Sequence, residues 1–95
     1  MELHGIELRY VLTMHLAHSG PATIAEMVDA LTRQGFGFRG RASKAVSDAL
    51  RWEIGRGRVR RMGRGVYGPR EIPRATEYRI HQRVMGLRDK AKLSL

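Results

Sequence analysis

The sequence contains no cysteine, and this absence removes several kinds of chemistry at once. Without cysteine the chain can form no disulfide, no thiolate zinc site and no cysteine nucleophile. Long apolar runs are also absent, so no segment has the length of a membrane span. The N-terminus lacks the basic start and apolar stretch of a signal peptide. We therefore expect a cytoplasmic protein that does not associate with membranes.

Acidic residues are scarce in the middle third of the chain, where basic residues are concentrated. The 95 residues carry a formal net charge of +9. Residues 33–64 hold ten basic residues against Asp48 and Glu53, a net +8, whereas residues 1–32 carry a net −3 and residues 65–95 a net +4. Such a concentration predicts a surface directed at a polyanion, the alternative being a solvated basic surface. The length allows one domain with a modest core.

Apolar spacing predicts two helices in the N-terminal half, over residues 6–18 and 23–34. Thr23 followed by Glu26 is a capping-box pattern for the start of the second helix. Gly35 and Phe36 suit a Schellman ending of that helix. Residues 35–42 are expected to form a loop that Phe36 and Phe38 anchor to the core.

A third helix is predicted over residues 43–54, with Ser43 as its N-cap. One stripe is apolar and consists of Val46, Ala49, Leu50 and Ile54. The opposite side is polar and consists of Lys44, Ser47, Asp48 and Arg51. Glu53 falls close to the apolar stripe, where we expect it at the rim, paired with an arginine of the following strand. Trp52 lies on the flank and is interpreted as part of the core.

A short β-hairpin is predicted next, with strands near residues 58–62 and 66–69 and a turn at Gly63-Arg64-Gly65. Val59 and Tyr67 are expected to face the core. A connector at 69–73 leads to a last helix over 74–93, with a frayed tail after Lys92. Its apolar stripe consists of Ile80, Val84, Leu87 and Ala91. The stripe could pack on the first helix or on its copy in a homodimer. The predicted fold class is mainly α with a small β-hairpin, an α+β fold.

The third helix and the hairpin resemble those of bacterial winged-helix DNA-binding domains. The matching patterns are V-S-x-A-L at 46–50 and G-x-V-x-R-x-G-x-G-x-Y at 57–67, within a match over about residues 20–70. The resemblance implies a winged helix-turn-helix domain at 1–72, followed by a C-terminal helix at 73–95 for core extension or dimerisation. Helix 43–54 would enter the major groove and the wing at 58–68 would contact backbone or minor groove. The implied DNA contacts are Arg41, Ser43, Lys44, Ser47, Arg51, Arg58, Arg60 and Arg64.

The resemblance implies a DNA-binding protein that regulates transcription, with double-stranded DNA as partner and the nucleoid as its location. Two alternatives stay open: a winged-helix module for protein contacts, as in a toxin–antitoxin or assembly complex, and a nucleoid-associated protein that binds DNA non-specifically. For Asp48 we favour an ion pair with Lys44 or Arg51 over a contact with a cytosine amino group.

We expect neither an enzyme nor a cofactor. No set of nucleophile, base and orienting group is apparent. His15 and His18 lack a third metal ligand. The G-x-G-x-x-G pattern at 63–68 lies between two predicted strands, whereas a dinucleotide site needs it between a strand and a helix.

Overall fold

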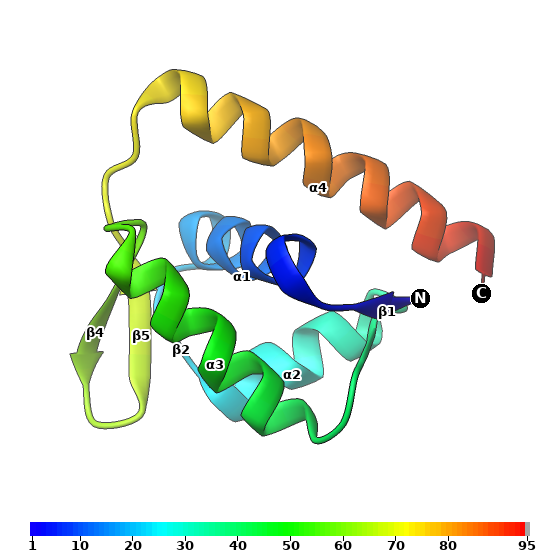
Figure 1. Ribbon diagram of the computed structural model, residues 1–95, viewed down its shortest axis with the longest axis horizontal. Coiled ribbons are helices and arrows are strands. Elements are labelled where there is room, and N and C mark those ends of the chain that lie inside the picture. The colour runs from blue at the N-terminus through cyan, green and yellow to red at the C-terminus, as the bar shows by residue number, and fades with distance from the viewer. Residues whose placement is uncertain (95) are drawn as a thin grey trace.

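The computed structural model describes residues 1–94, which form a mainly helical α+β fold and confirm the predicted fold class. Four helices surround one core, and two small sheets lie at their ends (Figure 1). The helices are α1 (Gly5–Ser19), α2 (Ile24–Arg33), α3 (Ala42–Gly55) and α4 (Arg74–Ser94). The strands are β1 (Glu2–Leu3), β2 (Ala22–Thr23), β3 (Gly37–Phe38), β4 (Val59–Gly63) and β5 (Val66–Pro69).

Helix α2 begins and ends as its sequence predicts. At its start, Thr23 Oγ1 accepts a hydrogen bond from the Glu26 amide at 3.1 Å, and Glu26 Oε1 accepts one from the Thr23 amide at 2.8 Å. At its end, the amide of Phe36 donates to the carbonyl of Leu31 and that of Gly35 to Thr32, each at 3.0 Å. Gly35 has a φ of +93°, which glycine adopts without the steric cost of a Cβ. The capping box and the Schellman ending are both confirmed.

The predicted hairpin forms from β4 and β5, and the structure adds a third strand that the sequence did not indicate. Arg61 lies opposite Tyr67 in the hairpin, and Ala22 of β2 pairs with Tyr67 from the other side, both antiparallel. Val59 and Tyr67 are buried, as expected. Because β2 has only two residues, it has too few positions to show an alternating pattern.

The segment 35–42 is more ordered than the predicted loop. β3 pairs with β1 in a parallel two-stranded sheet, with Leu3 next to Phe38. The Met1 ammonium donates to the Gly35 carbonyl at 3.0 Å, and the Gly37 amide donates to the Met1 carbonyl at 2.7 Å. Phe36 is buried and Phe38 packs against the core, as predicted. The chain start therefore fixes the segment that leads into α3.

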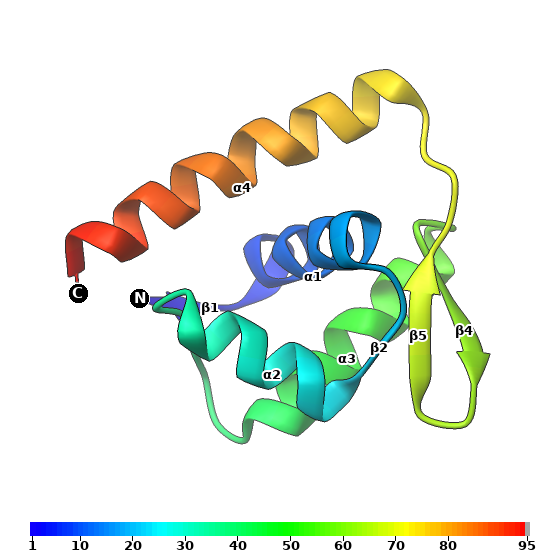
Figure 2. The same cartoon turned by 180° about the vertical axis from the view of Figure 1, so that it is seen from behind.

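Helix α1 lies at the centre, between α4 on one side and α2 with α3 on the other (Figures 1 and 2). The predicted stripe of α4 is buried in the common core: Ile80, Val84, Leu87 and Ala91. These four side chains are thus covered within a single chain. Helix α4 continues to Ser94, beyond the tail predicted after Lys92, and residue 95 lies outside the described residues. None of the helices formed by residues 1–94 has the length and apolar character needed to cross a membrane.

Three predictions about α3 are wrong. The helix begins at Ala42 rather than after Ser43, because Gly40 at φ +70° turns the chain and Arg41 takes the extended N-cap position. Ile54 is 40% exposed, and Glu53 occupies the buried position instead. Trp52 is 62% exposed and does not belong to the core.

Candidate nucleic-acid interface

Helix α3 and the β4–β5 hairpin are neighbours, and β4 begins close to the C-terminal end of α3 (Figures 1 and 2). The N-terminal end of α3 and the tip of the hairpin both reach the side opposite to α4 (Figures 1 and 2). The two elements are joined by a tight connection, in which Gly57 has a φ of +74°. The amide of Gly57 donates to the Ile54 carbonyl and that of Arg58 to the Glu53 carbonyl, each at 3.0 Å. This Schellman ending sets the direction in which the hairpin leaves α3.

A buried polar cluster holds this connection in place. Glu53 is fully buried, and Arg58 donates to it twice, from Nε to Oε1 at 2.8 Å and from Nη2 to Oε2 at 2.7 Å. Thr13 of α1 donates its hydroxyl to Glu53 Oε1 at 2.5 Å. The Arg58 guanidinium also lies 5.5 Å from the Tyr10 ring centroid. The cluster therefore joins α1, α3 and the start of the hairpin.

Arg58 is not available as a DNA contact, which corrects the prediction from the sequence. Its side chain is only 13% exposed and makes a two-pronged ion pair with Glu53. The pKa of Arg58 is raised above its usual value, chiefly by this hydrogen bonding to Glu53. The predicted pairing of Glu53 with an arginine is confirmed, but at a buried site rather than at the rim. Arg58 acts as a structural arginine that fixes the hairpin on α3.

The other predicted site residues lie on the surface. Six of them are exposed: Arg41, Ser43, Lys44, Arg51, Arg60 and Arg64. Ser47 is half-buried. Lys44 Nζ lies 3.0 Å from Asp48 Oδ2, so the interpretation of Asp48 as an ion-pair partner is confirmed. Of the predicted contacts, only Arg58 is held in a buried ion pair within residues 1–94.

Four arginines of this surface have no partner within residues 1–94. They are Arg41 at the N-cap of α3, Arg51 on its outer face, Arg60 on β4 and Arg64 at the hairpin turn. An unpaired guanidinium is weakly hydrated and presents a planar fork of donors suited to phosphates. The surface is therefore able to bind a polyanion without first breaking internal ion pairs.

The hairpin gains rigidity from its own side chains. Arg61 donates from Nη2 to the Tyr67 hydroxyl at 3.2 Å and lies 5.6 Å from the centroid of the same ring. Gly68 makes room for the neighbouring strand, since a Cβ there would overlap the sulfur of Met62. The strands are thus held together near their middle, while the Gly63–Gly65 turn projects beyond them.

The sequence analysis missed a group of residues beside the predicted site. The Arg9 guanidinium of α1 lies 5.3 Å from the ring centroid of Trp52, and Arg56 is the C-cap residue of α3, one turn after Trp52. The predicted helix already placed Trp52 on a flank, but a flank position is compatible with burial or exposure. Only the packing of α1 against α3 shows that the ring stays at the surface.

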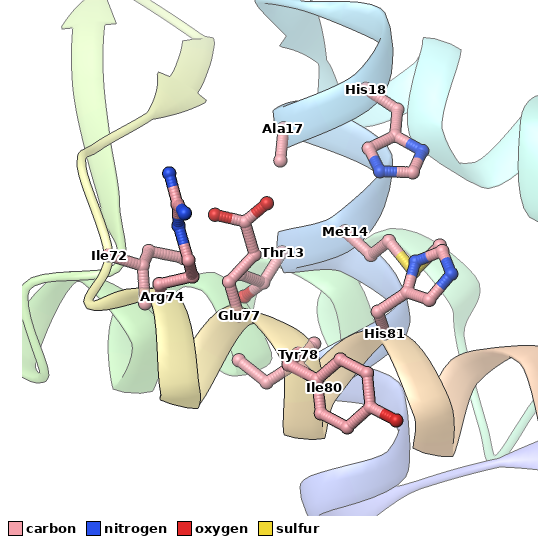
Figure 3. Close-up of a pocket in the computed structure, with 10 residues that line it drawn as sticks. All are labelled: Thr13, Met14, Ala17, His18, Ile72, Arg74, Glu77, Tyr78, Ile80 and His81. Atoms are coloured by element: carbon pink, nitrogen blue, oxygen red, sulfur yellow. The ribbon is translucent and has the colours of Figure 1, made fainter.

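A hollow lies between α1 and the start of α4 (Figure 3). Its volume is about 210 Å³, and Arg74 and Glu77 lie on one side of it with His18 and His81 on the other. The two imidazole centroids are 5.9 Å apart. Within residues 1–94, no group of three or more His, Cys, Asp or Glu side chains is placed to hold a metal ion. The residues in the hollow form no arrangement of nucleophile and base.

Comparison with known proteins adds no relative to this description. The chain matches no protein-family model, no curated protein and no solved structure. The function must therefore be argued from the geometry and charge of this chain alone.

Proposed function

We propose that this protein binds double-stranded DNA through the outer face of α3 and the β4–β5 hairpin, and that it regulates transcription. One observation supports the proposal: four arginines without a partner in residues 1–94 lie on the hairpin, on α3 or at its N-cap, and these two elements are adjacent. The order of three helices followed by a hairpin is that of a winged helix. A nucleoid location follows from the proposal.

Each element would have a separate task on the duplex. The major groove is wide enough for an α-helix, and Arg51 on the outer face of α3 would reach base edges or phosphates. Ser43 and the free amides of the first turn of α3 suit a phosphate at the helix N-terminus. Arg60 and Arg64 would contact the backbone or a narrow minor groove beside it. The Glu53–Arg58 pair would keep the helix and the hairpin at a fixed angle.

The experiment that tests the proposal is fluorescence anisotropy with labelled random duplex DNA over a range of salt concentrations. We expect the affinity to fall log-linearly with salt, because each neutralised phosphate releases counterions. Arg64→Ala should weaken binding to all sequences and reduce the steepness of the salt dependence by about one ion. Absence of binding at low salt would refute the proposal.

A matched control separates this surface from diffuse attraction. Arg79 of α4 is exposed, has no partner within residues 1–94 and carries the same charge. Arg79→Ala should leave the affinity close to that of the parent protein, because α4 lies on the opposite side. If it weakens binding as much as Arg64→Ala does, net charge rather than the α3–hairpin surface attracts the DNA.

Selection of preferred sites from a random duplex library tests the regulatory part. A preferred site whose recognition at one position is relaxed by Arg51→Ala would support base readout by α3, with about tenfold or more discrimination at that position. Equal binding to all sequences would instead indicate a non-specific, nucleoid-type protein.

A further inference from the structure

Trp52 is the only tryptophan of the chain, and most of its side chain is in solvent. It lies on α3, at 62% exposure, beside the arginines of the proposed DNA surface. Tryptophan is highly buried on average in folded proteins, so a ring this exposed needs an explanation. A ring this exposed contributes little to the core.

The ring of Trp52 is held in place before any ligand binds. The Arg9 guanidinium lies 5.3 Å from the ring centroid, within the range of a cation–π contact. Nε of Arg9 is buried and has no hydrogen-bond partner within residues 1–94. Within residues 1–94, Arg9 therefore contacts the aromatic ring of Trp52 rather than a carboxylate. A ring oriented in this way loses little conformational freedom when a ligand stacks on it.

Trp52 lines two hollows, one toward α1 and one on the outer surface of α3. The first has a volume of about 550 Å³. Its lining includes the apolar side chains of Leu8 and Ala49 and the arginines Arg9, Arg39 and Arg56. The second, of about 690 Å³, is lined by α3 alone: Lys44, Asp48, Arg51, Trp52, Gly55 and Arg56. Gly55 leaves this hollow open one turn from the ring, since a Cβ there would meet no atom within 4 Å.

The arginines beside the Trp52 ring carry the positive charge that a nucleic-acid backbone requires. Arg51 and Arg56 line the outer hollow without a side-chain partner in residues 1–94, while Lys44 already neutralises Asp48. A flat aromatic face bordered by unpaired arginines suits a base together with its flanking phosphates, because every base has a π face. An acidic peptide would satisfy the charges but would leave the flat face without a matching group.

We propose that Trp52 is a stacking platform for an unpaired base of single-stranded nucleic acid, with Arg51 and Arg56 contacting the adjacent phosphates. The inference rests on the proposed function, because Arg51 of α3 would contact phosphates both in duplex DNA and in a single strand. It differs in the ligand, since stacking on Trp52 requires a base that is out of the duplex. The protein would then bind melted or single-stranded DNA as well as duplex.

The test uses the intrinsic fluorescence of Trp52, which needs no label because the chain has no second tryptophan. Oligothymidylate of about 12 nucleotides, within the range of one single-strand site, should quench the emission in a saturable way. An abasic oligonucleotide of the same length carries the same phosphates without bases and should leave the emission unchanged. Equal quenching by both would overturn the stacking proposal.

Variants separate stacking from folding. By anisotropy with labelled oligothymidylate, Trp52→Ala should lower the affinity about tenfold or more, and Trp52→Phe should restore most of it, since either aromatic ring can stack. Gly55→Leu should also weaken binding, because residues three apart on a helix are neighbours and the new side chain would cover the ring. Tyr78→Ala, at an equally exposed aromatic residue on α4, is the matched control and should have no effect.

The outcomes for the two ligands are distinguishable. If Trp52→Ala weakens oligothymidylate binding and leaves duplex binding intact, both proposals are supported. If it changes neither, the stacking proposal fails while the duplex proposal stands on the arginine variants. If the parent protein binds oligothymidylate but no duplex, the stacking proposal survives without the proposed regulator. Quenching only by a glutamate-rich peptide would assign the surface to a protein partner and overturn the proposal.

Discussion

Helices α3 and α4 both carry basic residues but use them in different ways. In α4, Arg83 Nη2 lies 3.0 Å from Glu7 of α1, and Arg88 Nε donates to Gln34 at the end of α2, also at 3.0 Å. In α3, Arg51 on the outer face has no partner within residues 1–94. The ionic anchor of α3 lies inside, where Glu53 meets Arg58.

This difference shows that net charge and available charge are separate quantities. The middle third has a net charge of +8 after its own Asp48 and Glu53 are counted, and these pair with Lys44 and Arg58. Arg33 and Arg39 are in addition paired with Asp29 and Glu2 of the first third, so fewer than eight charges are available. The arginines of this third without a partner in residues 1–94 lie on α3, at its two ends or on the hairpin: Arg41, Arg51, Arg56, Arg60 and Arg64. On α4, by contrast, Arg83 and Arg88 tie the helix to its neighbours. Four predictions test this contrast, and the first concerns the change with the greatest expected loss of stability.

Glu53→Ala should be the most destabilising change. It leaves Arg58 and the Thr13 hydroxyl without their shared acceptor in a buried site, and removing one partner of a buried ion pair costs about 3–5 kcal/mol. The free energy of unfolding, measured in urea by circular dichroism, should fall by that amount. Asp48→Ala removes a carboxylate from an exposed pair on the same helix and should cost about 1 kcal/mol or less.

The double replacement Glu53→Met with Arg58→Met sharpens this test. Apolar residues of similar volume can substitute for a buried ion pair without loss, so the double variant should recover much of the stability that Glu53→Ala loses. If Glu53→Ala and Asp48→Ala are equally mild, the buried cluster is not the anchor of α3.

Leu87→Ala should have the next largest effect, and it tests how α4 is attached. Leu87 is 2% exposed in the shared core, and truncating a buried leucine costs about 2–5 kcal/mol. Leu93, 89% exposed on the same helix, is the control, and its replacement by alanine should leave the urea midpoint almost unchanged. Equal and small effects would mean that α4 is only loosely attached to the rest of the chain in solution.

Much of this fold could be predicted from the sequence, where local signals and tertiary packing agree. The Thr23–Glu26 capping box, the Gly35 ending and the α4 stripe depend on residues close in sequence, and all three were identified. The β1–β3 pair joins residues 35 apart, and strands of two residues carry no periodicity. Ser43 is a good N-cap by residue type, but Gly40 turns the chain earlier, so the helix begins at Ala42.

The candidate site was harder to predict because burial decides what each charged residue does. Glu53 lies on the core face of α3, and its role became clear only when Thr13 and Arg58 were found beside it. Arg58 and Arg60 have equal weight in the hairpin pattern, but Arg58 lies in the connection before β4, where it meets Glu53. Arg60 follows the buried Val59 within β4, and successive residues of a strand point to opposite faces. Arg58 is therefore held in a buried ion pair with Glu53, whereas Arg60 is exposed to solvent.

Arg83→Ala should have a small effect, since its ion pair with Glu7 is about half exposed on the arginine side. Partly exposed pairs contribute about 1 kcal/mol or less. A double-mutant cycle with Glu7→Ala, followed by urea unfolding, measures the coupling between the two side chains directly. A coupling as large as the loss caused by Glu53→Ala would remove the contrast between the surface-tied α4 and the internally anchored α3.

The smallest effect is a pH dependence at His15 of α1, which lines a hollow with Glu26, Asp29 and Arg33 of α2. The pKa of His15 is lowered from its ordinary 6.5, first by burial and second by the positive charge of Arg88. As pH falls below about 6.5, the unfolded chain takes up the proton before the folded one does, so stability is complete above this pH and decreases below it. His15→Gln should flatten this part of the curve of unfolding free energy against pH. Arg88→Ala should flatten it less, because burial is the larger cause. The reverse order would mean that the charge on α4, rather than the packing of α1, keeps His15 neutral.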